Sequence, residues 1–233
     1  MSLKVEVWSD VVCPWCYVGK RRFEQALAGF PAADSVNVVF RSFELDPAAP
    51  AEVHGDYAER LAAKYGTTLD KAREMIASMT ATAAQDGIDL RFDLARGGST
   101  FDAHRLLHLA RERGLQAALK ERFMQATFTE GAPIGDRTTL VALAAEVGLD
   151  ADEARQVLES GRYAEDVRAD EEQARAHGIT GVPFFVVDGT YGVSGAQPSD
   201  VLRQVLDQAW ADRPVLVPAG GAAPGCEGDS CPV

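Results

Sequence analysis

The chain has 233 residues, of which 46% are hydrophobic and 25% charged, so it can bury the core of one domain with a sizeable insertion. Its net charge of -12 disfavours binding to nucleic acid or to an anionic membrane surface, because both repel an acidic protein. The sequence has no apolar run long enough to span a bilayer and no signal-peptide pattern. We therefore expect a cytoplasmic protein that binds neither nucleic acid nor membrane.

The first part of the chain predicts a strand, a helix and a second strand. Residues 4–8 alternate with a period of two, which is typical of a strand. A helix is expected from Cys13 to about Gly29, because Pro14 suits the first helical turn. Residues 36–45 are rich in β-branched and aromatic side chains and predict the second strand.

A long helical block follows over residues 57–177, and four to six helices fit its length. Three pairs of residues with capping-box spacing mark expected helix starts: Thr67 with Asp70, Ser99 with Asp102, and Asp150 with Glu153. Three methionines of this block are expected to lie in helix cores: Met75, Met79 and Met124.

Strand character returns near the end of the chain. Residues 183–187 predict a strand, the Asp-Gly pair at 188–189 a tight turn, and residues 190–193 the returning strand of a hairpin. An amphipathic helix is expected over residues 198–210. The order strand-helix-strand, helical block, strand-strand-helix predicts an α/β fold with one sheet built from both ends of the chain.

The four cysteines form two close pairs, Cys13 with Cys16 and Cys226 with Cys231. In a reducing compartment such pairs are more often catalytic or metal-binding than structural. Cys13 lies at the expected helix N-terminus, where unpaired N–H groups and the helix dipole favour a thiolate. Cys16 follows one turn later, close enough to form a disulfide. The first pair therefore predicts a redox-active dithiol in which Cys13 attacks and Cys16 resolves the mixed disulfide.

The second pair lies in a tail rich in Pro, Gly and Ala, residues 213–233. Cys226 and Cys231 can close a disulfide across a short loop, and a flexible tail of this length could carry them to the first dithiol as an auxiliary pair. They could also complete a zinc site with Cys13 and Cys16, or take no part in the chemistry. Because the redox interpretation is preferred, no metal site is assigned.

Several segments resemble the DsbA family, and closely its FrnE-type cytoplasmic branch. These are Ser9 to Gly19, Phe43 to Leu45, Thr100 to Arg105, Thr180 to Phe184 and Ser194 to Pro198. The resemblance covers residues 3–212 and implies a thioredoxin fold with a large inserted all-helical domain. On this basis the thioredoxin-like domain comprises residues 1–50 and 160–212, and the inserted domain residues 51–159.

The same resemblance implies a cis peptide bond between Val182 and Pro183, with Pro183 beside the dithiol. Val182 would then offer its backbone N–H and C=O groups to a substrate chain. Four other residues of the matching segments are expected to contact the substrate: Pro14, Trp15, Gly195 and Gln197.

Two carboxylates are candidates for taking the proton from Cys16 during resolution: Asp10, after the first strand, and Glu44, at the end of the second. Each could instead be a solvated loop or edge residue. His104 and His108 are one helical turn apart, which is also the spacing of metal ligands. Since no third ligand is evident, we interpret them as a packed or surface pair, although His104 could also face the dithiol.

Three functions remain from the sequence. The preferred one is a thiol-disulfide oxidoreductase that acts on disulfide-containing proteins or small thiols and holds no cofactor, with glutathione as a candidate co-substrate. The second is a glutathione-dependent enzyme of the kappa-class transferase or 2-hydroxychromene-2-carboxylate isomerase type, although such enzymes generally carry Ser where Cys13 stands. The third is a zinc-holding module. The sequence leaves the oligomeric state open.

Overall fold

The computed structural model describes residues 2–213. In chain order its helices and strands are β1 (Leu3–Ser9), α1 (Pro14–Ala28), the 3₁₀ turn η1 (Ala33–Ser35), β2 (Val36–Ser42), α2 (Tyr57–Tyr65), α3 (Leu69–Gln85), α4 (Phe101–Glu112), α5 (Gln116–Gln125), the π-helical turn η2 (Ala126–Glu130), α6 (Arg137–Glu146), α7 (Ala151–Glu159), α8 (Ala164–Ala176), β3 (Phe184–Val187), β4 (Tyr191–Ser194) and α9 (Ser199–Ala211).

The sheet has the strand order β2-β1-β3-β4, so strands from both ends of the chain meet at its centre. Strand β1 runs parallel to β2 and antiparallel to β3, which in turn pairs antiparallel with β4. The hairpin turn between β3 and β4 has positive φ at Asp188 and Gly189. Two such residues in succession match the right-handed twist of the strands, as the Asp-Gly pair predicted.

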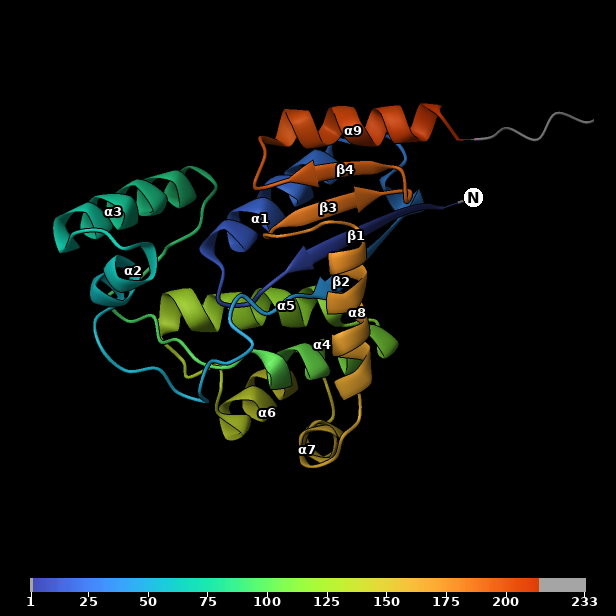
Figure 1. The fold of residues 1–233 in the computed structure, drawn as a ribbon. Coiled ribbons are helices and arrows are strands. Elements are labelled where there is room, and N and C mark those ends of the chain that lie inside the picture. Colours follow the sequence, from blue (N-terminus) through green and yellow to red (C-terminus); the bar gives the residue numbers. More distant parts are fainter. Residues whose placement is uncertain (1, 214–233) are drawn as a thin grey trace, which may run out of the picture.

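Helices cover both faces of this sheet, with α1 and α9 on one side and α4, α5 and α8 on the other (Figure 1). Alternate residues of β1 serve the two sides: Leu3, Val5 and Val7 pack into the cluster shared with α1 and α9, whereas Trp8 points to α8 and donates its indole N–H to the Asp170 carbonyl. The first strand is therefore buried on both faces.

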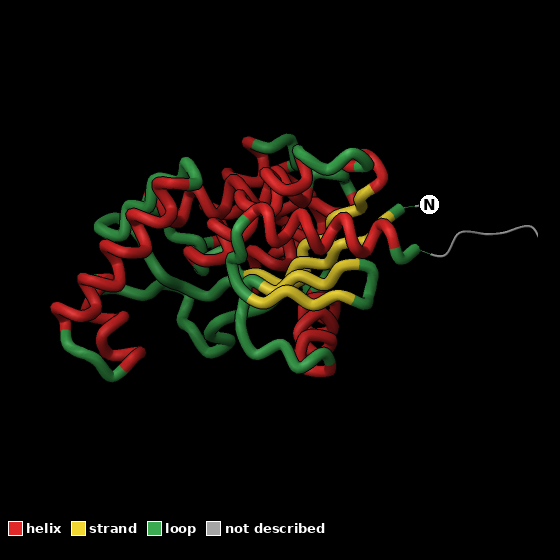
Figure 2. The backbone as a smooth tube through the Cα atoms, turned by 90° about the horizontal axis from the view of Figure 1, so that it is seen from above, coloured by secondary structure: helices red, strands yellow, loops and turns green. Residues whose placement is uncertain are grey.

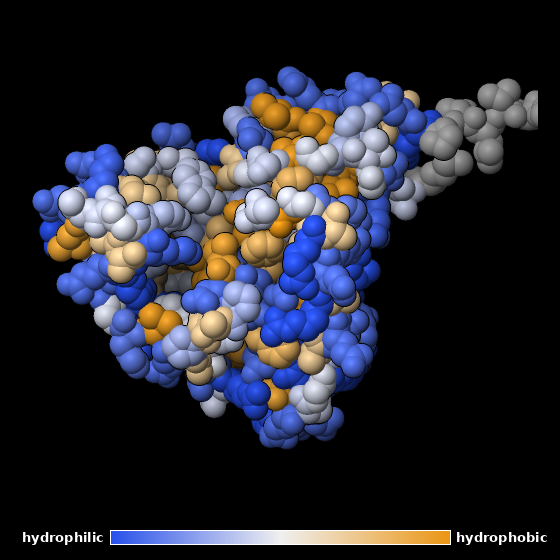
Figure 3. Space-filling view, viewed as in Figure 1, coloured by the Kyte–Doolittle hydropathy of each residue, from blue (hydrophilic) through white to orange (hydrophobic). Residues whose placement is uncertain are grey.

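Helices α2 and α3 form an arm that extends from this body on the side of the α1 N-terminus (Figures 1 and 2). The arm is joined to the body by a hydrophobic cluster that includes Met79 of α3, Phe128 of η2 and Tyr17 of α1, together with both cysteines of the first pair. A hollow with hydrophobic side chains lies between the arm and the body (Figure 3). The dithiol thus lies where the two parts meet.

The structure confirms the α/β fold and the predicted element order, and corrects several details. Residues 57–177 hold seven helices rather than four to six. One break that the prediction missed is Gly66, which ends α2 in the left-handed conformation. Strand β2 ends at Ser42, three residues before the predicted end. Met79 and Met124 are buried as expected, but Met75 is 37% exposed because it faces the hollow.

The three predicted helix starts differ in outcome. Asp150 caps α7 as predicted, since its carboxylate accepts a hydrogen bond from the Glu153 N–H at 2.8 Å. The cap of α3 is Thr68, one residue beyond the predicted Thr67, and Thr100 precedes α4 in place of Ser99. Neighbouring Thr and Ser residues compete for such positions, and the backbone path decides between them.

Two further predictions are only partly addressed by the fold. No helix within residues 2–213 has the length and apolarity needed to cross a bilayer. The tail cysteines Cys226 and Cys231 lie outside the described residues.

The close packing of α1 on the loop before β3 yields a test. A methyl group added at Gly19 would lie 2.8 Å from Cγ of Pro183 and 3.5 Å from Phe185. Alanine is the better helix former by about 1 kcal/mol, yet we expect Gly19→Ala to lower the free energy of unfolding by about 1–3 kcal/mol, because the methyl group overpacks this contact. Urea unfolding measures the change.

Gly161→Ala is the matched control, because no heavy atom lies within 4 Å of the added methyl group and its φ is not left-handed. Equal effects of the two substitutions would contradict a close contact between Gly19 and Pro183.

Candidate functional site

The dithiol occupies the first turn of α1. Cys13 is the N-cap, with extended φ and ψ of -100° and 111°, and Pro14 follows in the first turn. The Cys16 backbone N–H donates to Sγ of Cys13 at a donor–acceptor distance of 3.4 Å, and this turn holds no acidic residue. Both thiols are free. A thiolate on Cys13 would therefore meet the positive end of the helix with no opposing carboxylate in the turn.

The bond between Val182 and Pro183 is cis, as predicted. The turn lies beside the dithiol, because the Cys13 thiol donates to the Val182 carbonyl oxygen at a sulfur–oxygen distance of 3.7 Å. This confirms the predicted proximity. Two expected substrate contacts make hydrogen bonds within this region: the Gly195 N–H donates to the Pro183 carbonyl at 2.8 Å, and the Gln197 side chain donates to the Ser194 carbonyl at 2.9 Å. Neither lines the hollow beside Cys13, so their role toward a substrate stays a prediction.

The two thiols have different surroundings. Cys13 is 4% exposed and lines the hollow between the arm and the body, whereas Cys16 is 1% exposed and does not. Burial raises the pKa of Cys16 well above its ordinary value, and the neighbouring Cys13 raises it further. Cys16 therefore keeps its proton until a nearby group removes it.

Asp10 is the candidate proton acceptor that the structure brings to the dithiol. Its carboxylate is fully buried, lies 3.3 Å from Nε2 of His104 and accepts the Leu45 N–H at 2.8 Å. Burial acts to raise the pKa of Asp10, but the His104 hydrogen bond and the Leu45 N–H outweigh it, so the net shift is downward. The backbone N–H of Asp10 also favours the Cys16 thiolate. An ionised carboxylate is thus held at the pocket that Cys13 lines.

Glu44 lies in a different cluster. Its carboxylate is buried and accepts a hydrogen bond at 2.6 Å from Arg168, which also pairs with Glu171 at 2.8 Å. Burial raises the pKa of Glu44 to about 7, although Arg168 opposes the shift. Both candidates are buried, so neither is the solvated loop or edge residue that the sequence analysis kept as an alternative. Of the two, only Asp10 lines the hollow at Cys13.

The two histidines of α4 are buried and serve different partners. His104 approaches Asp10, while Nε2 of His108 lies 3.2 Å from both Ser42 Oγ and an Asp170 carboxylate oxygen. Burial lowers the pKa of His104, despite the attraction of Asp10. No group of three potential metal-binding side chains occurs within residues 2–213. His104 therefore belongs to the environment of the dithiol, by way of Asp10.

Lys120 of α5 is a site residue that the sequence analysis missed. Its side chain is completely buried, and its ammonium group donates to the Ser9 carbonyl at 3.1 Å. Burial lowers the pKa of Lys120 to about 8, while the charges of Cys16, Asp10 and Cys13 act in the opposite direction. The same ammonium group lowers the pKa of Cys16. The sequence offers only one sign of this role, a lysine directly after Leu119. Many surface lysines also follow a leucine, so this pattern does not single out Lys120.

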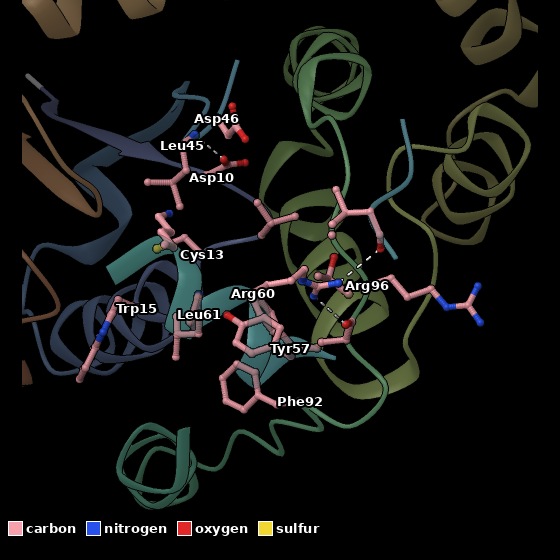
Figure 4. A pocket seen from close by; sticks show the side chains of 18 of the residues that line it. Asp10, Cys13, Trp15, Leu45, Asp46, Tyr57, Arg60, Leu61, Phe92 and Arg96 are labelled. Carbon is pink, nitrogen blue, oxygen red and sulfur yellow. Dashed lines mark hydrogen bonds between the residues drawn. The ribbon is translucent and has the colours of Figure 1, made fainter. Parts of the chain in front are cut away.

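The hollow beside Cys13 is a pocket of about 420 Å³. Cys13, Pro14 and Trp15 of the α1 turn line it together with Gly181 and Val182, and the opposite wall comes from α2, α3 and the segment before α4 (Figure 4). Trp15 is 46% exposed at the rim. A sulfur atom of a bound compound could therefore reach Cys13 from this pocket.

Residues 4–207 match the model of the DsbA-like thioredoxin domain. The chain belongs to this family. A probable DsbA oxidoreductase from Streptomyces coelicolor is similar over 99% of both chains, with 48% identity and a TM-score of 0.88. The uncharacterized protein YwbO of Bacillus subtilis is 30% identical over 88% of this chain and 96% of its own length.

More distant structures share the fold of this DsbA-like chain. The cytosolic disulfide reductase DsbM from Pseudomonas aeruginosa is 19% identical and has a TM-score of 0.61; the match covers 89% of this chain and 98% of DsbM. A 2-hydroxychromene-2-carboxylate isomerase is 17% identical and also has a TM-score of 0.61; the match covers 89% of this chain and 94% of the isomerase.

The Lys120 ammonium group generates a test. Because burial lowers its folded-state pKa to about 8, the protonated form costs stability in full below that pH, and the cost disappears as the pH rises toward the unfolded-state value. Lys120→Met should therefore raise the free energy of unfolding at neutral pH by about 2 kcal/mol, after allowing for the lost Ser9 hydrogen bond. Denaturant unfolding measures this gain.

The same variant should resolve mixed disulfides about tenfold more slowly at neutral pH, because the Cys16 thiolate loses the favourable charge of Lys120 that lowers the pKa of Cys16. Quenched-flow trapping measures this rate, and the rate deficit should shrink as the pH rises. Lys71→Met, on the exposed surface of α3, is the control. A stabilised variant with an unchanged resolution rate would show that Lys120 does not act on Cys16.

Proposed function

We propose that this chain is a thiol-disulfide oxidoreductase that exchanges disulfides through Cys13 and Cys16. The observation that carries the proposal is the unequal placement of the two thiols at one helix N-terminus. Cys13 opens onto the pocket beside Val182, while Cys16 is enclosed near the Lys120 charge and the Asp10 backbone N–H. Disulfide exchange needs one accessible thiolate and one protected thiol nearby.

In the reducing direction, the Cys13 thiolate attacks one sulfur of a substrate disulfide. A Cys13–substrate disulfide forms, the substrate S–S bond breaks, and the other half leaves as a thiolate. Cys16 then loses its proton to Asp10 and attacks Sγ of Cys13, which releases the second half as a thiolate. The dithiol has been oxidised and the substrate reduced by two electrons. The released thiolates take up protons, including the one held by Asp10, and the reverse sequence oxidises a substrate dithiol.

The residues around the dithiol have separate tasks in this proposal. Lys120 favours the Cys16 thiolate as it forms, and His104 orients the Asp10 carboxylate. The carbonyl of Val182 accepts the Cys13 thiol in the reduced state, and it becomes available to a substrate backbone N–H once Cys13 has lost its proton. Substrates would be disulfide-containing proteins or small disulfides, with glutathione as co-substrate. A cytoplasmic location and a role for the tail cysteines stay predictions from the sequence.

The glutathione-dependent isomerase shares the fold with this chain, and no contact within the described residues favours that reaction over disulfide exchange. The zinc-holding alternative depends on Cys226 and Cys231, which lie outside the described residues.

Substitution of each cysteine tests the roles. Cys13→Ser should reduce the rate of insulin disulfide reduction by at least about a thousandfold, because no other thiol stands at the helix N-terminus. Cys16→Ala should keep the first attack and accumulate a Cys13–substrate disulfide, because the resolving thiol is gone. Mass spectrometry of acid-quenched mixtures detects the adduct.

Ser160→Ala, at the end of α7, serves as a control of similar size away from the dithiol. Insulin reduction that survives in Cys13→Ser would refute the proposed function. Adducts that accumulate in Cys13→Ser rather than in Cys16→Ala would show that the two roles are reversed.

A further inference from the structure

The pocket beside Cys13 has the size of a small-molecule site. Its volume of about 420 Å³ lies within the range of ligand pockets. Cys13 lies at one end, and the arm helices α2 and α3 close the opposite side (Figures 3 and 4). A compound held here would present a sulfur atom to Cys13 while the arm contacts the rest of it.

The arm side of the pocket carries an aromatic wall. The rings of Tyr57 and Phe92 have centroids 4.7 Å apart, and Phe92 meets Phe128 edge-on at 6.2 Å. Met79 and Ile76 of α3 extend this apolar surface. Figure 4 shows the Tyr57 ring directed toward the side of the pocket where Cys13 lies. Such a wall favours a flat aryl group, since offset and edge-on aromatic contacts add to the gain from burial.

The same side carries positive charge that no carboxylate of the described residues neutralises. Arg60 donates to three backbone carbonyls, those of Val53, Gly55 and Ala95, and its guanidinium lies 5.3 Å from the centroid of the Tyr57 ring. Carbonyl groups fix the guanidinium but leave its full charge. Lys64 follows Arg60 by one turn of α2 and also lines the pocket.

This concentration of free cations is unusual for the molecule. Leaving Arg213 aside, the lysines and arginines of residues 2–212 without a carboxylate within ion-pair distance among the described residues are Arg60, Lys64, Arg96, Arg111, Lys120 and Arg175. The first three line the pocket, although Arg96 extends away from Cys13 (Figure 4).

The acidic residues of the pocket do not cancel this charge. Asp10 is engaged with His104 and the Leu45 N–H, and Asp46 accepts the Ala48 N–H on the body side of the pocket. In a protein of net charge -12, the arm side therefore offers an anion a local site of opposite sign.

We propose that this pocket binds a small aryl disulfide, or the corresponding thiol, that bears a carboxylate. The aryl ring would lie against Tyr57 and Phe92, the carboxylate near Arg60 and Lys64, and the sulfur at Cys13. The inference rests on the proposed function, because it names the substrate class of the same dithiol. The pre-reduced dithiol supplies both electrons: the aryl disulfide leaves as two aryl thiolates, and Cys13 and Cys16 become a disulfide.

Single-turnover kinetics of the pre-reduced full chain test the proposal. The tail thiols are first replaced by serine, Cys226→Ser with Cys231→Ser, so that the signal reports the Cys13–Cys16 dithiol alone. Three probes separate the contributions: dithiobis(nitrobenzoate), an aryl disulfide with carboxylates; dithiodipyridine, an aryl disulfide without them; and hydroxyethyl disulfide, which has neither aryl ring nor carboxylate. Stopped-flow absorbance or fluorescence gives the rate constant of each.

The double variant Arg60→Gln with Lys64→Gln should slow the reaction with dithiobis(nitrobenzoate) about tenfold and that with dithiodipyridine less than about twofold, because only the first reagent carries charge. Tyr57→Leu should slow both aryl reagents by about threefold or more and spare hydroxyethyl disulfide. Arg60→Lys keeps the charge and should keep most of the rate. Lys71→Gln removes an exposed lysine of α3 that pairs with Glu74. It should leave the rate constants with all three probes nearly unchanged, because an exposed charge away from the pocket is screened by salt.

The outcomes distinguish the two proposals. If reduced wild-type protein does not react with hydroxyethyl disulfide, or Cys13→Ser still does, the proposed function fails. If that reaction occurs but the double variant slows both aryl reagents equally or neither, or Lys71→Gln matches its effect, the charged part of the inference is overturned. If Tyr57→Leu affects all three probes alike, the aryl part is overturned.

Discussion

Gly19 lies against the ring of Pro183, and most of the site depends on this contact. Because position 19 has no side chain beyond hydrogen, α1 can approach the turn before β3 closely enough for Cys13 to meet the Val182 carbonyl. The two segments come from opposite ends of the chain and are brought together by the pairing of β1 with β3. The first turn of α1 thereby gains a neighbouring backbone edge, the one that we propose as the binding edge for a substrate.

The helices between the two halves of the sheet contribute chemistry as well as packing. Helix α4 supplies His104 to Asp10, and α5 supplies Lys120 to the Ser9 carbonyl. Both interactions place polar groups in a buried region, where an unpaired charge is costly. The buried charge of Lys120 is compensated when Cys16 becomes a thiolate, because the ammonium group and the thiolate then stabilise each other.

The arm formed by α2 and α3 has a different relation to the dithiol. Its side chains meet those of the body in the hydrophobic cluster around Cys13 and Cys16, but Arg60 and Lys64 line the pocket without a carboxylate partner among the described residues. A fold shared with a disulfide reductase and an isomerase leaves the substrate undecided, because function belongs to the site and not to the fold. The walls of this pocket are therefore the part of the molecule in which substrate preference can reside.

The sequence by itself determined the element order, the dithiol at a helix N-terminus and the hairpin turn at Asp188 and Gly189. These features follow from local signals: a period of two, a proline in the first helical turn, and residues that accept positive φ. It also singled out Val182 and Pro183 through resemblance. The segments that carry this resemblance do not indicate which side chains from other parts of the chain pack against them.

Only the tertiary structure decided which polar residues meet the dithiol. Asp10 and Glu44 looked equivalent in sequence, yet one reaches His104 and the other Arg168. Lys120 stands 111 positions from the Ser9 carbonyl that it contacts, and Met75 faces the pocket rather than a helix core. The physical reason is that burial and pairing depend on packing between distant segments, whereas periodicity reports only the backbone conformation of each segment.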